Sequence, residues 1–170
     1  ESVAISADGE YIAAGSYDEK VLLLDREDGT PLWSYSLGSI VYSVAISADG
    51  EYIAVGSYDE RVYLFHKYDS TLHWTYTTGD SVRTVAVSAD GEYIAAGSVD
   101  TRVYLFDKDS STPLWSYTTG SDVHSVAIPA DGQYIAAGSA VPYFYFFLHD
   151  SSSPSWSFPT RTPVPSPGTS

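Results

Sequence analysis

The stretch Val44-Ala-Ile-Ser-Ala-Asp-Gly-Glu-Tyr-Ile-Ala-Val-Gly-Ser-Tyr-Asp59 decides the fold, because nearly the same phrase recurs along the chain. Its Ser-Ala-Asp-Gly core stands at residues 6–9, 47–50 and 88–91, and Pro-Ala-Asp-Gly stands at 129–132. Each step is 41 residues without insertion or deletion, and four steps plus six residues account for the length of 170. Tryptophans keep the same step, at Trp33, Trp74, Trp115 and Trp156. The chain is therefore an array of four copies of one unit.

One unit contains four short β-type runs separated by turns. In the second unit these runs are residues 42–47, 52–57, 61–65 and 73–77. The segment 48–50, Ala-Asp-Gly, predicts a tight hairpin turn, because Gly adopts positive φ at little cost. The second run is rich in Ala and Gly, whereas the third and fourth carry Tyr, Leu, Phe and Trp. Small and large surfaces can therefore meet when neighbouring sheets stack.

These features predict an all-β protein, a β-propeller of four-stranded antiparallel blades. We expect four blades, at residues 1–41, 42–82, 83–123 and 124–158. Residues 159–170 are rich in Pro, Ser and Thr, and proline cannot donate to a sheet ladder. We therefore expect an extended tail or linker there, or a disordered end.

The repeat also resembles known propeller families. The stretch 44–59 resembles the first half of a WD-repeat, and the stretch 104–120 is similar to a pyrroloquinoline-quinone (PQQ)-type repeat, whose Trp docks between blades. The combined pattern is similar to highly repetitive prokaryotic, often archaeal, surface propellers. Of the hydrogen-bonding residues of a WD-repeat, only the Ser and Asp are matched, at Ser57 with Asp59 and at the equivalent positions of the first and third units.

Four blades raise a closure problem, because an open arc exposes two apolar blade faces. We expect either a homodimer that closes an eight-bladed ring with C2 symmetry, or further blades in a longer chain. The fourth unit departs most from the others, with its third strand reading Tyr143-Phe-Tyr-Phe-Phe147. Such a blade is consistent with a cap, with a seam to another chain, or with drift of the last copy.

Composition excludes several classes of function. The 22 acidic against 8 basic residues give a formal net charge of −14, so we expect no nucleic-acid partner. No apolar run approaches the roughly 18 residues of a membrane helix, so we expect no membrane span. The chain has no Cys, which excludes disulfides and thiolate chemistry. Much of the acidic charge comes from turn residues repeated four times.

The sequence shows no catalytic constellation, and we expect a non-enzymatic protein without metal or cofactor. No two of the four histidines share a repeat position or have metal-ligand spacing, and no G-x-S-x-G motif or phosphate-binding loop is present. Repeated carboxylates in the hairpin turns are compatible with Ca²⁺ or a basic partner, or with turn geometry alone. They are Asp8, Asp49, Asp90 and Asp131, with Glu10, Glu51 and Glu92 beside them.

The positions that differ between near-identical units indicate a binding surface. In a propeller, the turn between the second and third strands lies on the same rim as the connection between blades. The variable residues there are of types enriched at interface hot spots, or they vary neutrally. We predict a partner-binding rim made of Tyr17, Lys20, Tyr42, Tyr58, Arg61, Arg83, Arg102 and His124.

We therefore expect a binding or scaffold propeller, extracellular or on a prokaryotic cell surface, that engages a protein or a glycan. The alternative is a structural module of a surface or filamentous assembly. A quinoprotein-like enzyme is a third alternative. Near-identical copies indicate either recent duplication or a designed sequence.

Overall fold

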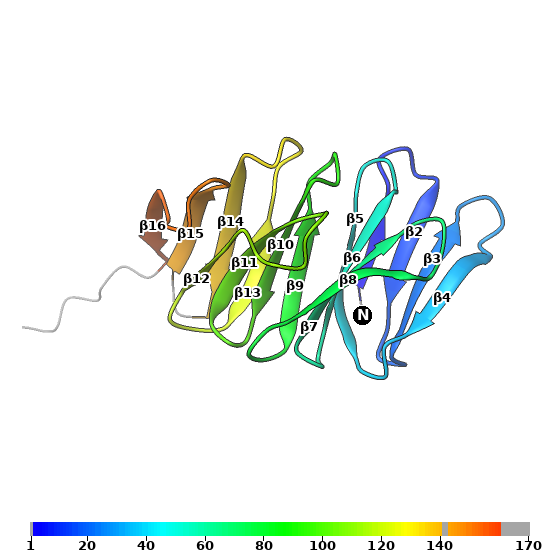
Figure 1. Ribbon diagram of the computed structural model, residues 1–170, viewed down its shortest axis with the longest axis horizontal. Coiled ribbons are helices and arrows are strands. Elements are labelled where there is room, and N and C mark those ends of the chain that lie inside the picture. Colours follow the sequence, from blue (N-terminus) through cyan, green and yellow to red (C-terminus); the bar gives the residue numbers. More distant parts are fainter. Residues whose placement is uncertain (1, 141–142, 161–170) are drawn as a thin grey trace, which may run out of the picture.

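The computed structural model describes residues 2–140 and 143–160, and this part of the chain is built from β-strands (Figure 1). Sixteen strands form four antiparallel sheets of four strands each. In each sheet, consecutive strands pair with one another from the first to the fourth. Within the described ranges, no helix has the length and apolarity needed to cross a membrane. The predicted all-β fold with four four-stranded blades is confirmed.

Each 41-residue unit supplies one blade. Blade 1 contains β1 (Ser2–Ile5), β2 (Tyr11–Gly15), β3 (Lys20–Asp25) and β4 (Pro31–Ser36). Blade 2 contains β5 (Val41–Ile46), β6 (Tyr52–Ser57), β7 (Arg61–His66) and β8 (Leu72–Thr77). Blade 3 contains β9 (Val82–Val87), β10 (Tyr93–Ser98), β11 (Arg102–Asp107) and β12 (Trp115–Thr118). Blade 4 contains β13 (Val123–Ala127), β14 (Tyr134–Ser139), β15 (Tyr143–Leu148) and β16 (Trp156–Pro159).

The strand ends differ slightly from the expected unit limits. β5, β9 and β13 each begin one residue before the limits at 42, 83 and 124, because that residue already pairs with the end of the neighbouring strand. Pro159 belongs to β16, where it pairs with Tyr143. The rest of the predicted tail, from residue 161, lies outside the described residues.

The hairpin between the first two strands of a blade is held by its own side chains. In blade 2, the Ser47 hydroxyl donates to the Asp49 carboxylate at 2.6 Å, and the Tyr52 amide donates to Ser47 Oγ at 3.0 Å. Asp49 also accepts from the Glu51 amide at 2.9 Å. Gly50 closes the turn with φ of +74°. Blades 1 and 3 repeat these bonds, so the recurring phrase encodes a recurring turn.

The core lies between the blades, which stand side by side along the long axis of the molecule (Figure 1). Glycine in the second strand lets the next blade approach closely: a Cβ at Gly56 would lie 2.8 Å from Val82 Cγ1. Tryptophan of the fourth strand then spans the junction. Trp33 packs on Phe65 with ring centroids 5.5 Å apart, and its indole donates to the Lys67 carbonyl at 2.9 Å. The interblade role of Trp expected from the PQQ-type resemblance is thus confirmed.

Candidate binding rim

The meander topology separates the turns onto two rims. The turn between the second and third strands meets the connection to the next blade through backbone hydrogen bonds. The Leu37 amide donates to the Glu19 carbonyl at 2.8 Å, and the Tyr58 amide donates to the Ile40 carbonyl at 2.9 Å. We call this edge the candidate rim; it comprises residues 16–20, 37–42, 57–61, 78–83, 98–102 and 119–124. The opposite rim carries the Asp-Gly hairpins, along the upper edge in Figure 1.

The predicted binding residues all lie on the candidate rim. Tyr17 and Tyr58 stand in turns, with 57% and 56% of their surface exposed. The basic residues at the start of the third strands are exposed at the edge of their sheets; they are Lys20, Arg61 and Arg102. The last group occupies the second position of the first strand in blades 2, 3 and 4; it consists of Tyr42, Arg83 and His124.

A β-bulge accounts for the position of this last group at the rim. The register shifts in blade 2 so that Val41 pairs with Ser57 and Ser43 with Gly56, which leaves Tyr42 without a partner residue. The same shift leaves out Arg83 in blade 3 and His124 in blade 4. A bulge turns the extra side chain away from the regular alternation of the strand. Arg83 and His124 are therefore exposed at the rim, and Tyr42 is half-buried there.

Three of the predicted residues form one cluster at the junction of blades 2 and 3. Tyr42 and Tyr58 meet edge to face, with ring centroids 6.1 Å apart. The Arg83 guanidinium carbon lies 4.5 Å from the centroid of the Tyr42 ring. Among the described residues, no ring or cation contact links the other five predicted residues to this cluster. The cluster therefore places the exposed side chains of Tyr58 and Arg83 beside the half-buried ring of Tyr42.

Two pairs of a half-buried Asp and a buried Tyr lie at the rim and were not predicted as a site. The hydroxyl of Tyr63 donates to Asp59 at 2.5 Å, and that of Tyr104 donates to Asp100 at 2.5 Å. Burial, followed by the hydrogen bond to Asp59, raises the pKa of Tyr63 to about 12. The sequence signal was available, since a Tyr follows the turn Asp by four residues in blades 2 and 3.

Asp100 also ties two blades together. It accepts from the Gly79 amide of blade 2 at 2.8 Å and from the Arg102 amide at 3.0 Å. Asp59 differs, since its Oδ1 is buried and has no hydrogen-bond partner among the described residues. The rim framework is thus tighter between blades 2 and 3 than between blades 1 and 2.

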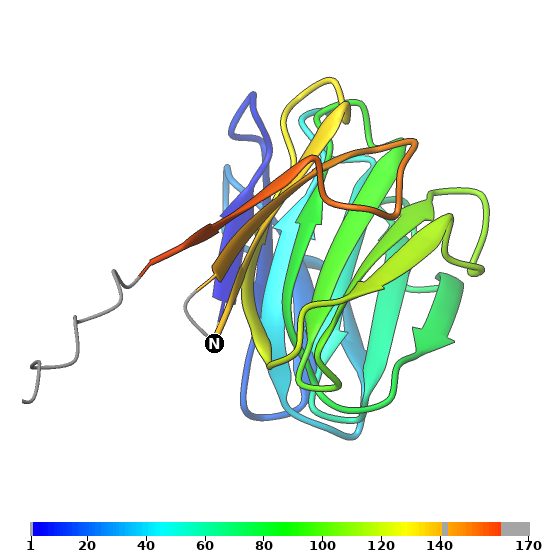
Figure 2. The same ribbon diagram turned by 90° about the vertical axis from the view of Figure 1, so that its left-hand side faces the viewer.

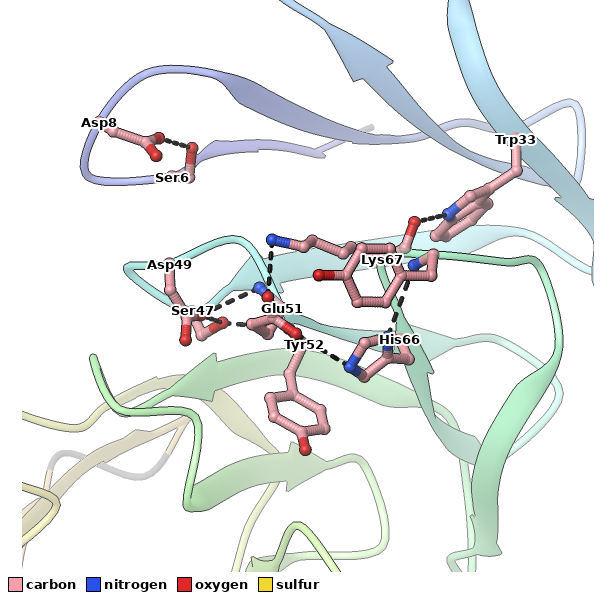
Figure 3. Close-up of polar contacts among 10 residues, drawn as sticks. Ser6, Asp8, Trp33, Ser47, Asp49, Glu51, Tyr52, His66 and Lys67 are labelled. Atoms are coloured by element: carbon pink, nitrogen blue, oxygen red, sulfur yellow. Dashed lines mark hydrogen bonds and ion pairs between the residues drawn. The ribbon is translucent and has the colours of Figure 1, made fainter.

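The carboxylates of the opposite rim are engaged within their own blades (Figure 3). Asp8 accepts from Ser6 and from the Glu10 amide, and these hydrogen bonds hold the pKa of its carboxyl below the usual value. Glu51 contacts Lys67 Nζ at 2.6 Å and His66 Nε2 at 3.0 Å. The ion pair with Glu51 raises the pKa of Lys67. Within the described ranges, no group of three His, Asp or Glu side chains converges as a metal site.

The blades and their interblade tryptophans define a β-propeller protein of WD-repeat and PQQ-type character. The family model described as outer membrane protein assembly factor BamB matches residues 1–129 of the 170, so the chain belongs to that family. The structure is also similar to a chain in a crystal structure of the mitotic checkpoint complex, with a TM-score of 0.83 and 21% identity. That match covers 93% of this chain and 52% of the other, so this chain spans about half its length. A search of curated proteins gave no significant match.

Proposed function

We propose that the protein is a non-enzymatic binding propeller that engages a protein or a glycan through the candidate rim. The observation that carries this proposal is the cluster of the exposed Tyr58 and Arg83 around the half-buried Tyr42, on a bulged edge. Tyr and Arg supply large contact areas and directional hydrogen bonds, and rigid sheets below them reduce the entropy lost on binding. Glycan rings stack on aromatic faces, and carboxylates of either partner class pair with guanidinium groups.

A binding function is also supported by how the polar side chains elsewhere are used. The Asp residues of the hairpin turns, which are the most repeated acidic groups, accept hydrogen bonds from their own turns. These Asp side chains therefore have a structural role in their turns. We further propose an extracellular or cell-envelope location, which the description of the matching family as an outer membrane assembly factor supports.

The test removes the three arginines of the candidate rim together, as Arg61→Ala, Arg83→Ala and Arg102→Ala. Wild-type and variant proteins are probed with a glycan array and with labelled cell-envelope proteins. We expect the triple variant to bind the glycans or proteins captured by the wild type at least about tenfold more weakly, because hot-spot arginines contribute more than 1 kcal/mol each to binding.

A matched control removes three positive charges from the opposite rim, as Arg26→Ala, Lys67→Ala and Lys108→Ala. This control has the same net charge as the rim variant, so it separates a local effect from long-range electrostatics. Partners that are kept by the rim variant and lost by the control would contradict the proposed site. Tyr58→Ala adds a change that leaves the net charge untouched, and we expect it to weaken the same partners.

The exposed end blades favour a second candidate function, as a module of a larger assembly. Val3 and Ile5 at one end and Phe158 at the other have 76%, 60% and 63% of their surface exposed. Apolar side chains gathered on one face commonly mark an interaction site.

A further inference from the structure

The outer face of blade 4 is an uncovered apolar surface within the described part of the chain. Tyr134, Phe144, Trp156 and Phe158 are between 42% and 63% exposed. They line or flank a groove of about 530 Å³ over all four strands of blade 4, the blade that faces the viewer in Figure 2. The equivalent face of blade 3 is covered by blade 4, where Trp115 packs on Phe147 at 5.2 Å.

The outer face of blade 1 is the counterpart. Val3 and Ile5 occupy the repeat positions of Val44 and Ile46, which pack against the preceding blade. Within the described residues no blade packs against this side of blade 1, and both Val3 and Ile5 are exposed. The described part of the chain therefore has two different outer faces, at opposite ends of its long axis (Figure 1).

Each internal junction is closed by the same three hydrogen bonds. At the first junction, the Val44 amide donates to Ser2 Oγ at 3.1 Å, the Ala7 amide to the Ala48 carbonyl at 2.9 Å, and Trp33 Nε1 to the Lys67 carbonyl at 2.9 Å. The second and third junctions repeat all three bonds at distances of 2.6 to 3.3 Å. The blades are therefore joined by one recurring set of donors and acceptors.

The two outer faces carry the groups that stand at the same repeat positions as these donors and acceptors. On blade 4 these are the hydroxyl of Ser125, the amide of Ala130 and the indole of Trp156. On blade 1 they are the amide of Val3 and the carbonyls of Ala7 and Arg26. A junction between blade 4 and blade 1 would pair every one of them.

The side chains that break the repeat are matched in size across such a junction. Blade 4 places Phe144 and Phe146 on its outer face, where blade 3 has the smaller Val103 and Leu105. On the face of blade 1 that would meet blade 4, the side chains are smaller than in the later blades. Leu22 stands at the repeat position of a Tyr and Leu24 at that of a Phe. The later residues are Tyr63, Tyr104 and Tyr145, and Phe65, Phe106 and Phe147. Cores tolerate such exchanges when the total volume is kept. The unusual fourth copy thus fits the unusual first copy.

We propose that blade 4 of one copy packs on blade 1 of a second copy, head to tail, and that two such junctions close an eight-bladed ring. Each junction would bury the apolar groove of blade 4 and repeat the hydrogen bonds of the internal junctions. Two copies related by a twofold axis satisfy both end faces of each chain at once. This inference is independent of the partner bound at the candidate rim.

The test places lysines on one end face at a time, in the 170-residue chain. The blade 1 variant carries Val3→Lys and Ile5→Lys, and the blade 4 variant carries Phe144→Lys and Phe158→Lys. Tyr68→Lys is the control, because Tyr68 is as exposed as Val3, at 76%, but lies on a loop of the opposite rim. Circular dichroism and a urea midpoint check that each variant folds.

Sedimentation velocity is expected to give two copies for the wild type and the control. Each variant alone should weaken self-association at least about 100-fold, because a buried unpaired ammonium is strongly unfavourable. An equimolar mixture of the two variants should regain a two-copy species through its one intact junction. A single copy of the wild type at every concentration would overturn the proposal.

Two further outcomes also decide the question. If the blade 1 variant remained dimeric while the blade 4 variant did not, the contact would join two blade 4 faces and the head-to-tail junction would be wrong. Species larger than two copies would overturn the closed ring.

Discussion

Asp59 and Asp100 occupy the same repeat position but have different surroundings. Both accept from a tyrosine hydroxyl, whereas Asp100 alone also accepts from the Gly79 amide of the preceding blade. The difference between the two shows that near-identical units acquire individual properties from the connections around them.

This difference predicts unequal losses of stability. We expect Asp100→Ala to lower the free energy of unfolding by about 0.5–1.5 kcal/mol more than Asp59→Ala, because it also removes the hydrogen bond from the exposed Gly79 amide. Urea denaturation of the two variants measures the difference. Equal losses would show that the bond to Gly79 contributes little.

The buried tyrosines predict a loss of stability in alkali. The pKa of Tyr63 is raised to about 12 in the folded protein, above the ordinary value of 10.0, so its contribution is full below pH 10. It is lost as the pH rises from 10 through 12, because the unfolded chain releases the proton first. Between pH 9 and 11.5 we expect the wild type to lose on the order of 1–2 kcal/mol more than Tyr63→Phe in urea titrations. Parallel losses in the two proteins would contradict this assignment.

At the scale of the element, each of the three internal junctions contains one tryptophan that bridges the two blades. Trp74 donates to the Lys108 carbonyl at 2.6 Å and packs on Phe106 at 5.2 Å. The indole therefore combines apolar burial with satisfaction of a carbonyl at the end of a strand.

Trp74→Phe keeps an aromatic ring and removes the donor. We expect it to lower the free energy of unfolding by about 1–2 kcal/mol, since the Lys108 carbonyl loses its partner. Tyr68→Phe, on an exposed loop, is the control and should change stability by less than about 0.5 kcal/mol. A Trp74→Phe protein as stable as the wild type would mean that the indole acts through its apolar surface alone.

Most elements could be predicted from the sequence because the unit repeats without a change in length. The hairpin Asp-Gly, the alternation of Val44 and Ile46, and the Trp in phase determine strands, turns and blade order together. The bulges at Tyr42, Arg83 and His124 could not be predicted, because they depend on the register between two strands. A bulge is an extra residue on one strand relative to its partner, so it is seen only when the two strands are paired residue by residue.

The candidate rim could be predicted only in part, for the same reason. The sequence placed variable residues on the correct edge, since strand order determines which turns share a rim. It did not show which of them would touch, because the cluster of Tyr42, Tyr58 and Arg83 needs the relative position of blades 2 and 3. The bond from Gly79 to Asp100 likewise depends on that arrangement.

At the scale of the whole molecule, the size changes in the first and fourth blades predict a coupled effect. Leu24→Phe restores the repeat residue in blade 1 and should overfill a junction that already contains Phe144 and Phe146. We expect it to weaken self-association about tenfold or more, because overpacking costs about 1–3 kcal/mol.

Adding Phe146→Leu to Leu24→Phe should restore part of the lost affinity between copies, because it removes about the side-chain volume that Leu24→Phe adds to the junction. Sedimentation equilibrium of the single and double variants measures this coupling. Independent effects of the two substitutions would show that the residues do not meet across copies.

Small-angle X-ray scattering of the wild-type chain tests the central claim, that this propeller is half of a closed ring, most directly. We predict a forward scattering intensity that corresponds to two chains of 18.4 kDa and a curve fitted by a closed ring of eight blades. A curve fitted by the isolated four-bladed arc, with the mass of one chain at the highest concentration, would contradict the account.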